Sequence, residues 1–366
     1  MRDSGPRLLF IFSEVFATGG IQRFNQTILD ACCQLGIQFH VLSLKDSTAA
    51  LSSRLDGARV RGFDGNRRRF AWAVARAVIR GDFEKVLIGH INFLALAVAA
   101  MTVRPRFGSS MLLIAHGIEV WSGIGRVRRF ALSKVDRILC VSSYTRDRIM
   151  AQAGRLDPSR LTIFPNALAK KWREETASAP AASGSARFIL SVTRLDRGDR
   201  DKGVDSAIKA FSMLTDRTLQ YFIVGSGNDM GYLQSVAELC GVHDRVRFMQ
   251  GVGDLELKSL YRTCQAFVLP SGKEGFGIVF LEAMFFGAPV IAAGEKGALD
   301  VVRDGETGLT VPFGDVAAIR QAIERIIADR DLRDHLRTLG RSTVLDGGRF
   351  TFAAFTARCA EVFESR

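Results

Sequence analysis

Short apolar runs alternate with amphipathic stretches along the whole chain. This alternation is typical of strand–helix units arranged around largely parallel sheets, so we predict an α/β fold. The strands expected in the first half are RLLFIFS, QFHVLSL, KVLIG, MLLIAH and RILCVS, and those expected in the second half are ARFILSV, LQYFIVG, VRFMQG, AFVLP and PVIAA.

The segment KWREETASAPAASGSA, residues 171–186, interrupts this pattern. Its Ala, Ser, Pro and Gly content is that of a surface linker rather than of a packed element. We therefore predict one domain over residues 1–170 and a second over 187–348, and 366 residues of 47% apolar composition are enough for two cores. The closing segment, 349–366, carries an amphipathic helical pattern, and we expect this helix to dock on the rest of the protein.

The longest apolar run is VLIGHINFLALAVAAMTV, residues 86–103. It has about the minimum length of a membrane span, but Gly89, His90 and Asn92 lie near its start. We expect a strand, a short polar turn and a buried helix. A spanning helix is the alternative hypothesis, because a buried α/β core gives the same hydropathy.

A second apolar segment, EGFGIVFLEAMFFGAPVIA at 274–292, contains one charged residue in its middle. The pattern predicts a buried helix that ends at Gly287 and Pro289, followed by a strand. A buried carboxylate costs several kcal/mol unless a cation, a donor or a ligand meets it, so Glu282 needs a partner. Two hypotheses stand: Glu282 faces a ligand, or it forms a structural salt bridge.

The net charge of +12 is unevenly distributed, with +13 in residues 1–170 and −1 in the remaining 196. The excess forms three clusters, at Arg67 to Arg69, at Arg104 with Arg106, and at Arg126 with Arg128 and Arg129. An anionic partner for this half is one interpretation, and a solvated basic face without a partner is the other.

The six cysteines show no CxxC pairing, and no secretory signal precedes them. We therefore expect reduced, mostly buried thiols in a cytoplasmic protein, without a structural zinc site.

Glycines mark three places where a strand leads into a helix: ATGGIQRFNQ (17–26), VGSGND (224–229) and EGFG (274–277). Backbone N–H groups at helix N-termini favour anions, and three such loops in two domains point to a phosphate-containing ligand. In SVTRLDRGDRDKGVDSAIKAF, Arg194 and Lys202 flank a loop and supply two positive charges for a diphosphate. The acids of that loop (Asp196, Asp199 and Asp201) make an internal salt-bridge network the alternative.

Together these motifs resemble one family. The segment EGFGIVFLEAMFFGAPVIA followed by DVVRDGETGLTVPFGD is similar to the donor-site signature of the retaining nucleotide-sugar glycosyltransferases of family 4, in which two glutamates are separated by seven residues, as Glu274 and Glu282 are. TRL with a downstream KG, the N-terminal GG, HGIE at 116–119, VSSYTR at 141–146 and FPNA at 164–167 follow in the family's order. The resemblance implies a GT-B fold: two Rossmann-like domains that face each other across a cleft, with the donor on the C-terminal domain, the acceptor on the N-terminal one, and the final helix crossing back to the N-terminal domain.

The resemblance also implies roles for single residues. Glu282 would accept hydrogen bonds from the ribose hydroxyls, Glu274 would contact the donor sugar, and Arg194 and Lys202 would hold the diphosphate. His116 would lie beside the reacting carbon and polarise or position sugar and acceptor. The other residues expected at the donor are Gly19, Gly20, Gly225, Gly227, Gly275, Phe276, Gly277, Ile278 and Val279, and Glu119 is a candidate contact for the acceptor.

Glycosyl transfer passes through an oxocarbenium-like state while charge builds on the departing diphosphate. Fixed cations and helix N-termini can stabilise that charge, and no DxD-type motif follows a strand, so we predict a metal-independent enzyme without a cofactor. Sequence offers no well-placed nucleophile, which favours front-face attack over a covalent intermediate. UDP-linked glucose-type sugars and GDP-linked mannose remain open as donors.

The basic first half, including RRRFAWAVARAVIR at 67–80, suits a protein on the anionic inner face of the cell membrane that takes a lipid-linked acceptor. We expect a role in exopolysaccharide, O-antigen lipopolysaccharide or glycolipid biosynthesis. The alternatives are a GT-B-type sugar-nucleotide epimerase and a nucleic-acid-binding protein. The latter lacks aromatic residues interleaved with its basic clusters, so we expect no nucleic-acid partner.

Overall fold

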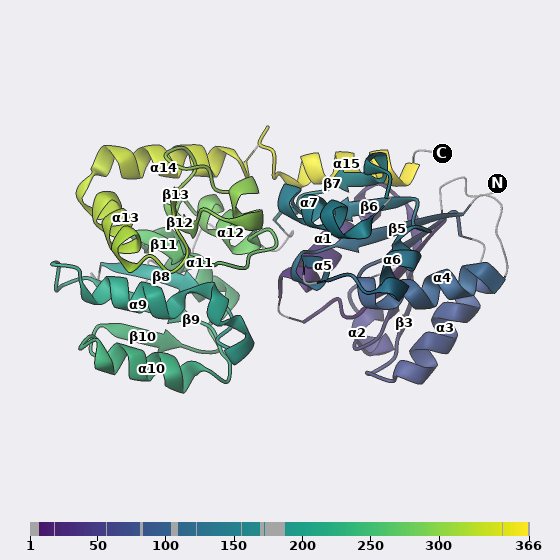
Figure 1. The fold of residues 1–366 in the computed structure, drawn as a ribbon, viewed down its shortest axis with the longest axis horizontal. Helices are drawn as coiled ribbons and strands as arrows, with labels where there is room; N and C mark the ends of the chain where they lie inside the picture. The colour runs from purple at the N-terminus through teal and green to yellow at the C-terminus, as the bar shows by residue number, and fades with distance from the viewer. Residues whose placement is uncertain are drawn as a thin grey trace. The chain divides into compact units, whose positions relative to one another are not determined.

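The computed structural model describes residues 7–17, 19–55, 57–80, 83–103, 109–121, 123–154, 156–168, 172, 187–345 and 347–364. Apart from Trp172, the predicted linker at 171–186 lies outside these residues, as do Arg104 and Arg106. The chain forms two compact units (Figure 1). Unit 1 comprises Met1–Lys171 and Phe352–Arg366, and unit 2 comprises Trp172–Thr351.

In its described residues, unit 1 is built on a seven-stranded sheet in the order β3-β2-β1-β4-β5-β6-β7, and every printed pairing is parallel. The strands are β1 (Arg7–Phe12), β2 (Gln38–Ser43), β3 (Arg59–Gly62), β4 (Lys85–Ile88), β5 (Ser110–Ala115), β6 (Arg137–Cys140) and β7 (Leu161–Ile163). The central strand β1 is buried from Leu8 to Phe12, because a parallel sheet is covered on both faces.

The helices of unit 1 cover this sheet. They are α1 (Gly20–Gln34), α2 (Thr48–Ser52), α3 (Arg67–Arg80), α4 (Leu94–Val103), α5 (Ile118–Trp121), α6 (Arg126–Leu132), α7 (Ser143–Ala153) and α15 (Phe352–Glu364), with 3-10 turns η1 (Ile91–Phe93) and η2 (Pro158–Arg160). The strand, polar turn and helix expected at 86–103 are thus confirmed as β4, η1 and α4. Among the described helices, none is long and apolar enough to cross a membrane.

The final helix belongs to unit 1, as predicted, although it starts at Phe352. Helix α15 packs against α1 (Figure 1), where the ring of Phe355 lies 5.7 Å from that of Phe24. The buried Lys85 Nζ donates a hydrogen bond to the Val362 carbonyl at 2.9 Å, near the C-terminal end of α15. Free carbonyls at a helix end favour such a cation, so β4 and α15 are tied together.

Unit 2 has a six-stranded parallel sheet within its described residues, in the order β10-β9-β8-β11-β12-β13. The strands are β8 (Phe188–Val192), β9 (Gln220–Val224), β10 (Val246–Met249), β11 (Ala266–Leu269), β12 (Val290–Ala293) and β13 (Leu309–Val311). The helices are α9 (Val204–Ser212), α10 (Met230–Leu239), α11 (Asp254–Thr263), α12 (Ile278–Phe285), α13 (Val316–Ala328) and α14 (Arg330–Ser342), with 3-10 segments η3 (Arg197–Lys202) and η4 (Lys296–Asp300).

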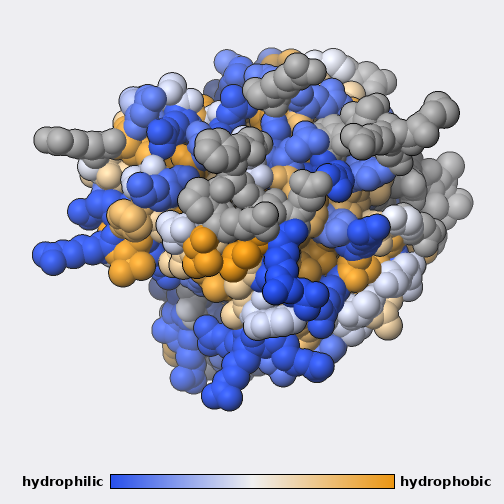
Figure 2. Space-filling view, turned by 90° about the vertical axis from the view of Figure 1, so that its right-hand side faces the viewer, coloured by the Kyte–Doolittle hydropathy of each residue, from blue (hydrophilic) through white to orange (hydrophobic). Residues whose placement is uncertain are grey.

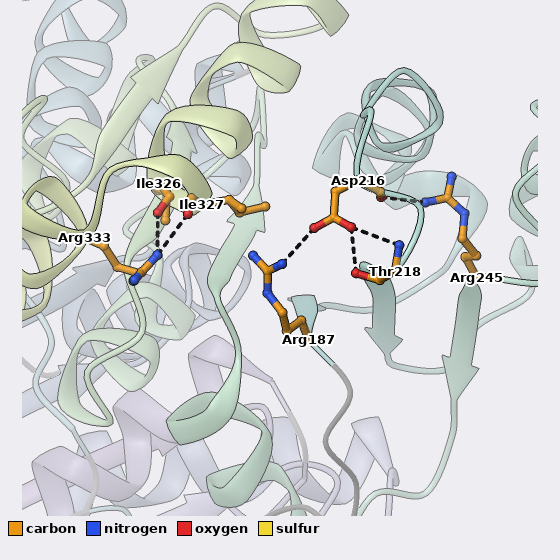
Figure 3. Close-up of polar contacts among 7 residues, drawn as sticks. All are labelled: Arg187, Asp216, Thr218, Arg245, Ile326, Ile327 and Arg333. Carbon is orange, nitrogen blue, oxygen red and sulfur yellow. Dashed lines mark hydrogen bonds and ion pairs between the residues drawn. The ribbon is translucent and has the colours of Figure 1, made fainter.

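Two arginines of unit 2 hold connecting segments in place, one directly before β8 and one at the C-terminal end of α13 (Figure 3). Arg187, directly before β8, pairs with Asp216 at 2.9 Å, and the Thr218 hydroxyl donates to the same carboxylate at 2.7 Å. The Thr218 hydrogen bonds hold the pKa of Asp216 below its ordinary value. Arg333 of α14 donates to the carbonyls of Ile326 and Ile327 at 3.0 and 3.2 Å, and so caps the C-terminal end of α13.

Strands β3, β7 and β13 were not expected from the sequence pattern. Each lies at an edge of its sheet. β3 alternates arginine with other residues (RVRG), and β7 and β13 have three residues each. An edge strand pairs on one side only and is commonly short or charged, so it lacks the apolar run that reveals a central strand.

Candidate active site

In unit 2, the segment between β11 and α12 carries the charged centre of the candidate site. Glu274 Oε2 and Lys202 Nζ form an ion pair at 2.7 Å. The two side chains are 14% and 17% exposed, respectively, so the pair is largely shielded yet reachable from solvent. At this degree of burial, screening by water is reduced and the geometry of the pair is well defined.

The segment η3 holds the same loop from one side. Lys273 Nζ pairs with Asp201 Oδ2 at 2.6 Å, and the Gly272 N–H donates to the Asp201 carbonyl at 2.8 Å. Gly203, the last residue before α9, has φ +72°, and a Cβ there would lie 2.5 Å from the Pro270 carbonyl oxygen. Only glycine allows both this backbone conformation and this close approach.

The turn η4 holds the loop from the other side. Lys296 has φ +57°, an uncommon backbone conformation for a residue with a side chain, and its Nζ donates to the Gly272 carbonyl. The Gly297 N–H donates to the Glu274 carbonyl at 3.1 Å. Left-handed residues persist where surrounding contacts determine them, and such residues cluster at ligand sites. Nothing in the sequence pattern marked Lys296, because a lysine after a strand is ordinarily a surface residue.

Helix α12 follows with the predicted features. Gly277 is its N-cap residue, and the helix ends where the Ala288 N–H donates to the Ala283 carbonyl and Gly287 has φ +77°. Glu282 is completely buried, and the Tyr261 hydroxyl of α11 donates a hydrogen bond to its Oε2 at 3.1 Å. A neutral donor therefore meets the carboxylate inside the unit, and this hydrogen bond compensates part of its desolvation.

Arg194 and the second glycine loop lie beside η3. Arg194 is 66% exposed and pairs with Asp199 at 3.1 Å, as the acids of this loop had suggested. Gly225 and Gly227 pack directly on the segment after β8, because a Cβ on either would collide with the backbone of Thr193 or Leu195. These contacts give the two glycines a packing reason, and their contact with a donor stays a prediction.

Arg200 and Asp229 form a further ionic tie that sequence reasoning missed. The guanidinium grips the carboxylate with two hydrogen bonds of 2.7 and 2.8 Å, and it lies 4.0 Å from the centre of the Tyr232 ring. Hydrogen bonds from Arg200 hold the pKa of Asp229 below its ordinary value. This fork fastens η3 to the start of α10.

In unit 1, His116 follows β5. Its Nε2 lies 3.0 Å from the Gly89 carbonyl, and since a carbonyl can only accept, Nε2 carries the proton and Nδ1 has a free lone pair. Burial lowers the pKa of His116 to about 4 although the hydrogen bond to Gly89 opposes this shift, so the ring is neutral near pH 7. The Phe24 ring packs edge-on at 5.2 Å and fixes the orientation of the imidazole.

Glu119 stabilises the turn that carries His116. Its Oε1 accepts from the backbone N–H groups of His116 at 2.6 Å and of Gly117 at 3.2 Å. The structure thus gives Glu119 a positioning role for the histidine, and its predicted contact with an acceptor stays a prediction.

Gly19 is the N-cap residue of α1, which begins at Gly20. The loop before it is held by Asp46, whose carboxylate accepts from the Val15 N–H at 2.7 Å and the Phe16 N–H at 3.3 Å. The buried Asn25 of α1 donates to the Glu14 carbonyl at 2.9 Å. Glu14 also pairs with Lys45 at 3.5 Å. The first glycine loop is therefore fastened mainly by hydrogen bonds between side chains and backbone groups.

Two family descriptions match this chain. Residues 18–169 match Glycosyltransferase Family 4, and residues 173–343 match Glycosyl transferases group 1. The GDP-mannose-dependent alpha-(1-6)-phosphatidylinositol monomannoside mannosyltransferase of Mycobacterium tuberculosis is 31% identical over 286 residues, which cover 74% of this chain and 73% of that protein. The chain is a family 4 glycosyltransferase.

A second relative and a solved structure are also similar to this chain. The lipopolysaccharide core biosynthesis glycosyltransferase LpsE of Rhizobium meliloti is 31% identical over 190 residues, 52% of this chain and 51% of that protein. The crystal structure of HepE from Anabaena in complex with UDP and glucose matches with a TM-score of 0.82 over 99% of this chain and 100% of that one, at 17% identity. The predicted GT-B fold is confirmed.

The glycosyltransferase brings some of its predicted site residues together and keeps others apart. Lys202 and Glu274 meet as an ion pair, whereas Arg194 turns to Asp199. Gly275 lies in the loop between Glu274 and α12. Phe276 is buried, and its ring packs on that of Phe350 at 5.6 Å. Ile278 and Val279 open α12. Their N–H groups belong to the first turn, where a helix leaves donors without intrahelical partners.

Among the described residues, no group of three or more His, Cys, Asp and Glu side chains is placed to hold a metal ion. The predicted independence of the glycosyltransferase from metals stays a prediction.

Proposed function

We propose that this glycosyltransferase transfers a sugar, with retention, from a UDP- or GDP-linked donor to a lipid-linked glycan acceptor in exopolysaccharide, O-antigen or glycolipid assembly. The observation that carries the proposal is the largely shielded Lys202–Glu274 pair, 2.7 Å apart, in a loop held on both sides and followed by the N-terminus of α12. Relatives named for phosphatidylinositol mannoside and lipopolysaccharide core synthesis support the lipid-linked acceptor.

Lys202 supplies the charge that the reaction needs. An ammonium group has three donors, and Glu274 takes one, so the others are available to phosphate oxygens. As the bond to the anomeric carbon breaks, negative charge grows on the diphosphate, and a cation already held in place stabilises it without reorganisation. Arg194 would add a second positive charge once a diphosphate competes for it with Asp199.

Glu274 and Glu282 bind the two sugars of the donor in this proposal. Glu274 Oε2 faces Lys202, and its other carboxylate oxygen accepts hydrogen bonds from hydroxyls of the transferred sugar. Glu282 accepts the ribose hydroxyls while Tyr261 holds it in position. The backbone N–H groups of Gly275, Gly277 and the first turn of α12 add neutral donors for sugar or phosphate.

His116 acts as a neutral acceptor. With Nε2–H committed to Gly89, its Nδ1 lone pair can orient a hydroxyl of the sugar or acceptor without adding a positive charge next to an oxocarbenium-like carbon. We propose front-face attack, because the sequence offers no well-placed nucleophile for a covalent intermediate. We further propose that no metal is needed, because the fixed cations and the helix N-terminus supply the electrostatic stabilisation. We also propose that the enzyme works in the cytoplasm, at the inner face of the membrane.

Thermal unfolding with millimolar UDP, GDP, ADP and their sugar conjugates, in the presence of EDTA, tests the donor site. A ligand at about a hundred times its dissociation constant stabilises by about 2.7 kcal/mol, and we expect this shift with one nucleotide family. Glu282→Gln should abolish it while keeping the shape of the buried side chain. The control is Glu306→Gln, an exposed glutamate of the same unit, which should keep the full shift.

The absence of a shift with every nucleotide, for folded enzyme, would overturn the donor site. Transfer of label from the donor to an added lipid-linked glycan then separates a transferase from an epimerase, which would convert the sugar nucleotide without any acceptor.

A further inference from the structure

Helix α6 combines exposed apolar side chains with a dense positive charge. Val127 and Phe130 are 70% and 60% exposed, although large apolar groups normally avoid water. The same short helix carries Arg126, Arg128 and Arg129. Among the described residues, none of these arginines pairs with a carboxylate; Arg128 donates to the Asn92 amide and Arg129 to a backbone carbonyl.

The neighbouring helices α3 and α4 also carry exposed apolar side chains. Helix α4 packs against both α3 and α6, so the three helices form one layer on unit 1. Trp72 of α3 and Val103 of α4 are also largely exposed. We call these four apolar residues, with the arginines of α3 and α6, the α3–α4–α6 face. Figure 2 shows the side of unit 1 that bears α3 and α4 in Figure 1, where hydrophobic patches alternate with strongly hydrophilic side chains.

A cavity of about 340 Å³ opens beside α6. Arg126, Arg129 and Ser133 line it from one helical stripe, because residues three and four apart share a face. Its apolar lining consists of Phe130, Leu132, Ala153 and Leu156. The neighbouring acid, Asp157, directs both carboxylate oxygens to Ser159. The Ser133 hydroxyl donates to the Phe130 carbonyl at 2.7 Å, so the cavity offers two guanidinium groups over an apolar base.

This chemistry fits an amphiphilic anion. Two guanidinium groups match a phosphate group, and the apolar base suits the carbon chain attached to it. A second copy of the chain fits poorly, because a two-fold symmetric contact would set these arginines against each other. Nucleic acid would leave the aliphatic Val103 and Val127 without apolar partners. A bilayer supplies both phosphate groups and hydrocarbon in one surface.

We propose that α6 anchors the enzyme to an anionic bilayer: the cavity beside α6 binds the phosphate of a membrane lipid, and Val127 and Phe130 insert among the acyl chains. The basic stretch of α3 then adds diffuse attraction rather than a defined site. The inference rests on the proposed lipid-linked acceptor for its biological purpose, since an enzyme held at the bilayer meets such an acceptor in two dimensions.

Co-sedimentation of the full-length enzyme with phosphatidylcholine vesicles, with and without phosphatidylglycerol, tests the proposal. The decisive variant is Arg126→Lys with Arg129→Lys, which keeps the charge and removes the guanidinium forks. We expect it to weaken binding to the anionic vesicles about tenfold. The matched control, Arg67→Lys with Arg68→Lys on α3, should bind as the wild type does.

The insertion is tested by Val127→Ser with Phe130→Ser, which should lower the vesicle affinity at least about tenfold. The control is Leu239→Ser, a still more exposed apolar residue of unit 2, which should change nothing. Wild-type binding by both lysine variants, or by the serine variant, would overturn the proposal, as would folded wild-type enzyme that ignores anionic vesicles. Nucleotide-induced stabilisation, measured on the same samples, reports the donor site separately.

Discussion

The two units present the same kind of strand-end loop, yet they hold these loops by different forces. In unit 2, opposite charges on side chains cross-link the loops: Lys202 to Glu274, and Lys273 to Asp201. In unit 1, carboxylates accept from backbone N–H groups instead, as Asp46 and Glu119 do. Unit 1 also has one ion pair in these loops, Lys45 with Glu14 at 3.5 Å, but the Lys45 side chain is 59% exposed. The arginine clusters of unit 1 that the structure describes lie on the outer helices α3 and α6.

This difference shows that, in two units of the same α/β architecture, the position of a cation determines the kind of ligand that it suits. A lysine fixed by an acid inside a loop is ready for a small, multiply charged ligand, and its electrostatic effect requires no reorganisation. An exposed arginine on an outer helix is mobile and hydrated, and it suits a large anionic surface. The overall charge of each half therefore says less about ligand binding than the location of each cation.

The largest effect is expected when Lys202, the cation of the candidate site in unit 2, is removed. Lys202→Met should lower kcat/KM for the sugar-nucleotide donor about a thousandfold, roughly 4 kcal/mol, because the departing diphosphate loses its fixed cation and Glu274 loses its partner. Steady-state kinetics measure this effect.

Lys273→Met is the matched control in the same loop, since the Lys273 side chain is half exposed and its pair with Asp201 is screened by water. We expect a change of at most about fivefold. Equal losses in the two variants would contradict a special role for the Lys202–Glu274 pair.

The close contact between Gly203 and Pro270, in the loop that carries Glu274, can be disrupted without altering any charge. Gly203→Ala should destabilise unit 2 by about 3 kcal/mol, because the new methyl group meets the Pro270 carbonyl in a backbone conformation that already disfavours it. Gly305→Ala has a similar φ but open space around its Cβ, so it should cost about 1 kcal/mol. Denaturant unfolding measures both, and equal losses would argue against the close contact.

The pH dependence of the folding stability tests the protonation state of His116 in unit 1. The pKa of His116 is about 4 in the folded protein and about 6.5 when unfolded, so the unfolded chain binds more protons between these values. Stability is complete above about pH 6.5 and falls as the pH drops towards 4, by at most about 3 kcal/mol.

His116→Gln should flatten this part of the stability profile, measured by thermal unfolding from acid to neutral pH. His40, whose pKa burial also lowers, contributes the same slope to both proteins. The pKa of His90 is lowered by burial and, in part, by His116, so the variant should also lose a part of the His90 contribution. An unchanged slope in the variant would mean that His116 is not the partly buried, neutral imidazole described above.

The smallest effect is expected for an ion pair outside either site. Arg187→Ala removes the pair with Asp216 (Figure 3), whose partners are 45% and 29% exposed, and should cost about 0.5 kcal/mol or less in denaturant unfolding. A loss of several kcal/mol would show that exposed ion pairs outside the candidate site contribute strongly to the stability of unit 2.

Much of the fold could be predicted from apolar runs, because the central strands of a parallel sheet are buried on both faces. The edge strands β3, β7 and β13 could not, since they are short or charged and pairing alone reveals them. The basic stretch at 67–80 that the sequence singled out has the same bounds as helix α3.

The candidate site was predicted in its residues more than in its connections. Spacing and family resemblance pointed to Lys202, Glu274 and Glu282, but no pattern indicates that Lys202 pairs with Glu274 or that Tyr261 donates to Glu282. Lys296 and Arg200 escaped notice for a similar reason. Their importance comes from backbone conformation and partners distant in sequence, which a single sequence does not display.

The return of α15 to unit 1 has a consequence for synthesis on the ribosome. Unit 2 is encoded as one uninterrupted stretch, whereas the surface of unit 1 around Phe24 and Lys85 waits for residues made after all of unit 2. The unit synthesised first is therefore the last to be completed. Until α15 emerges, its apolar docking site on α1 stays uncovered, so an incompletely synthesised chain offers that site to chaperones.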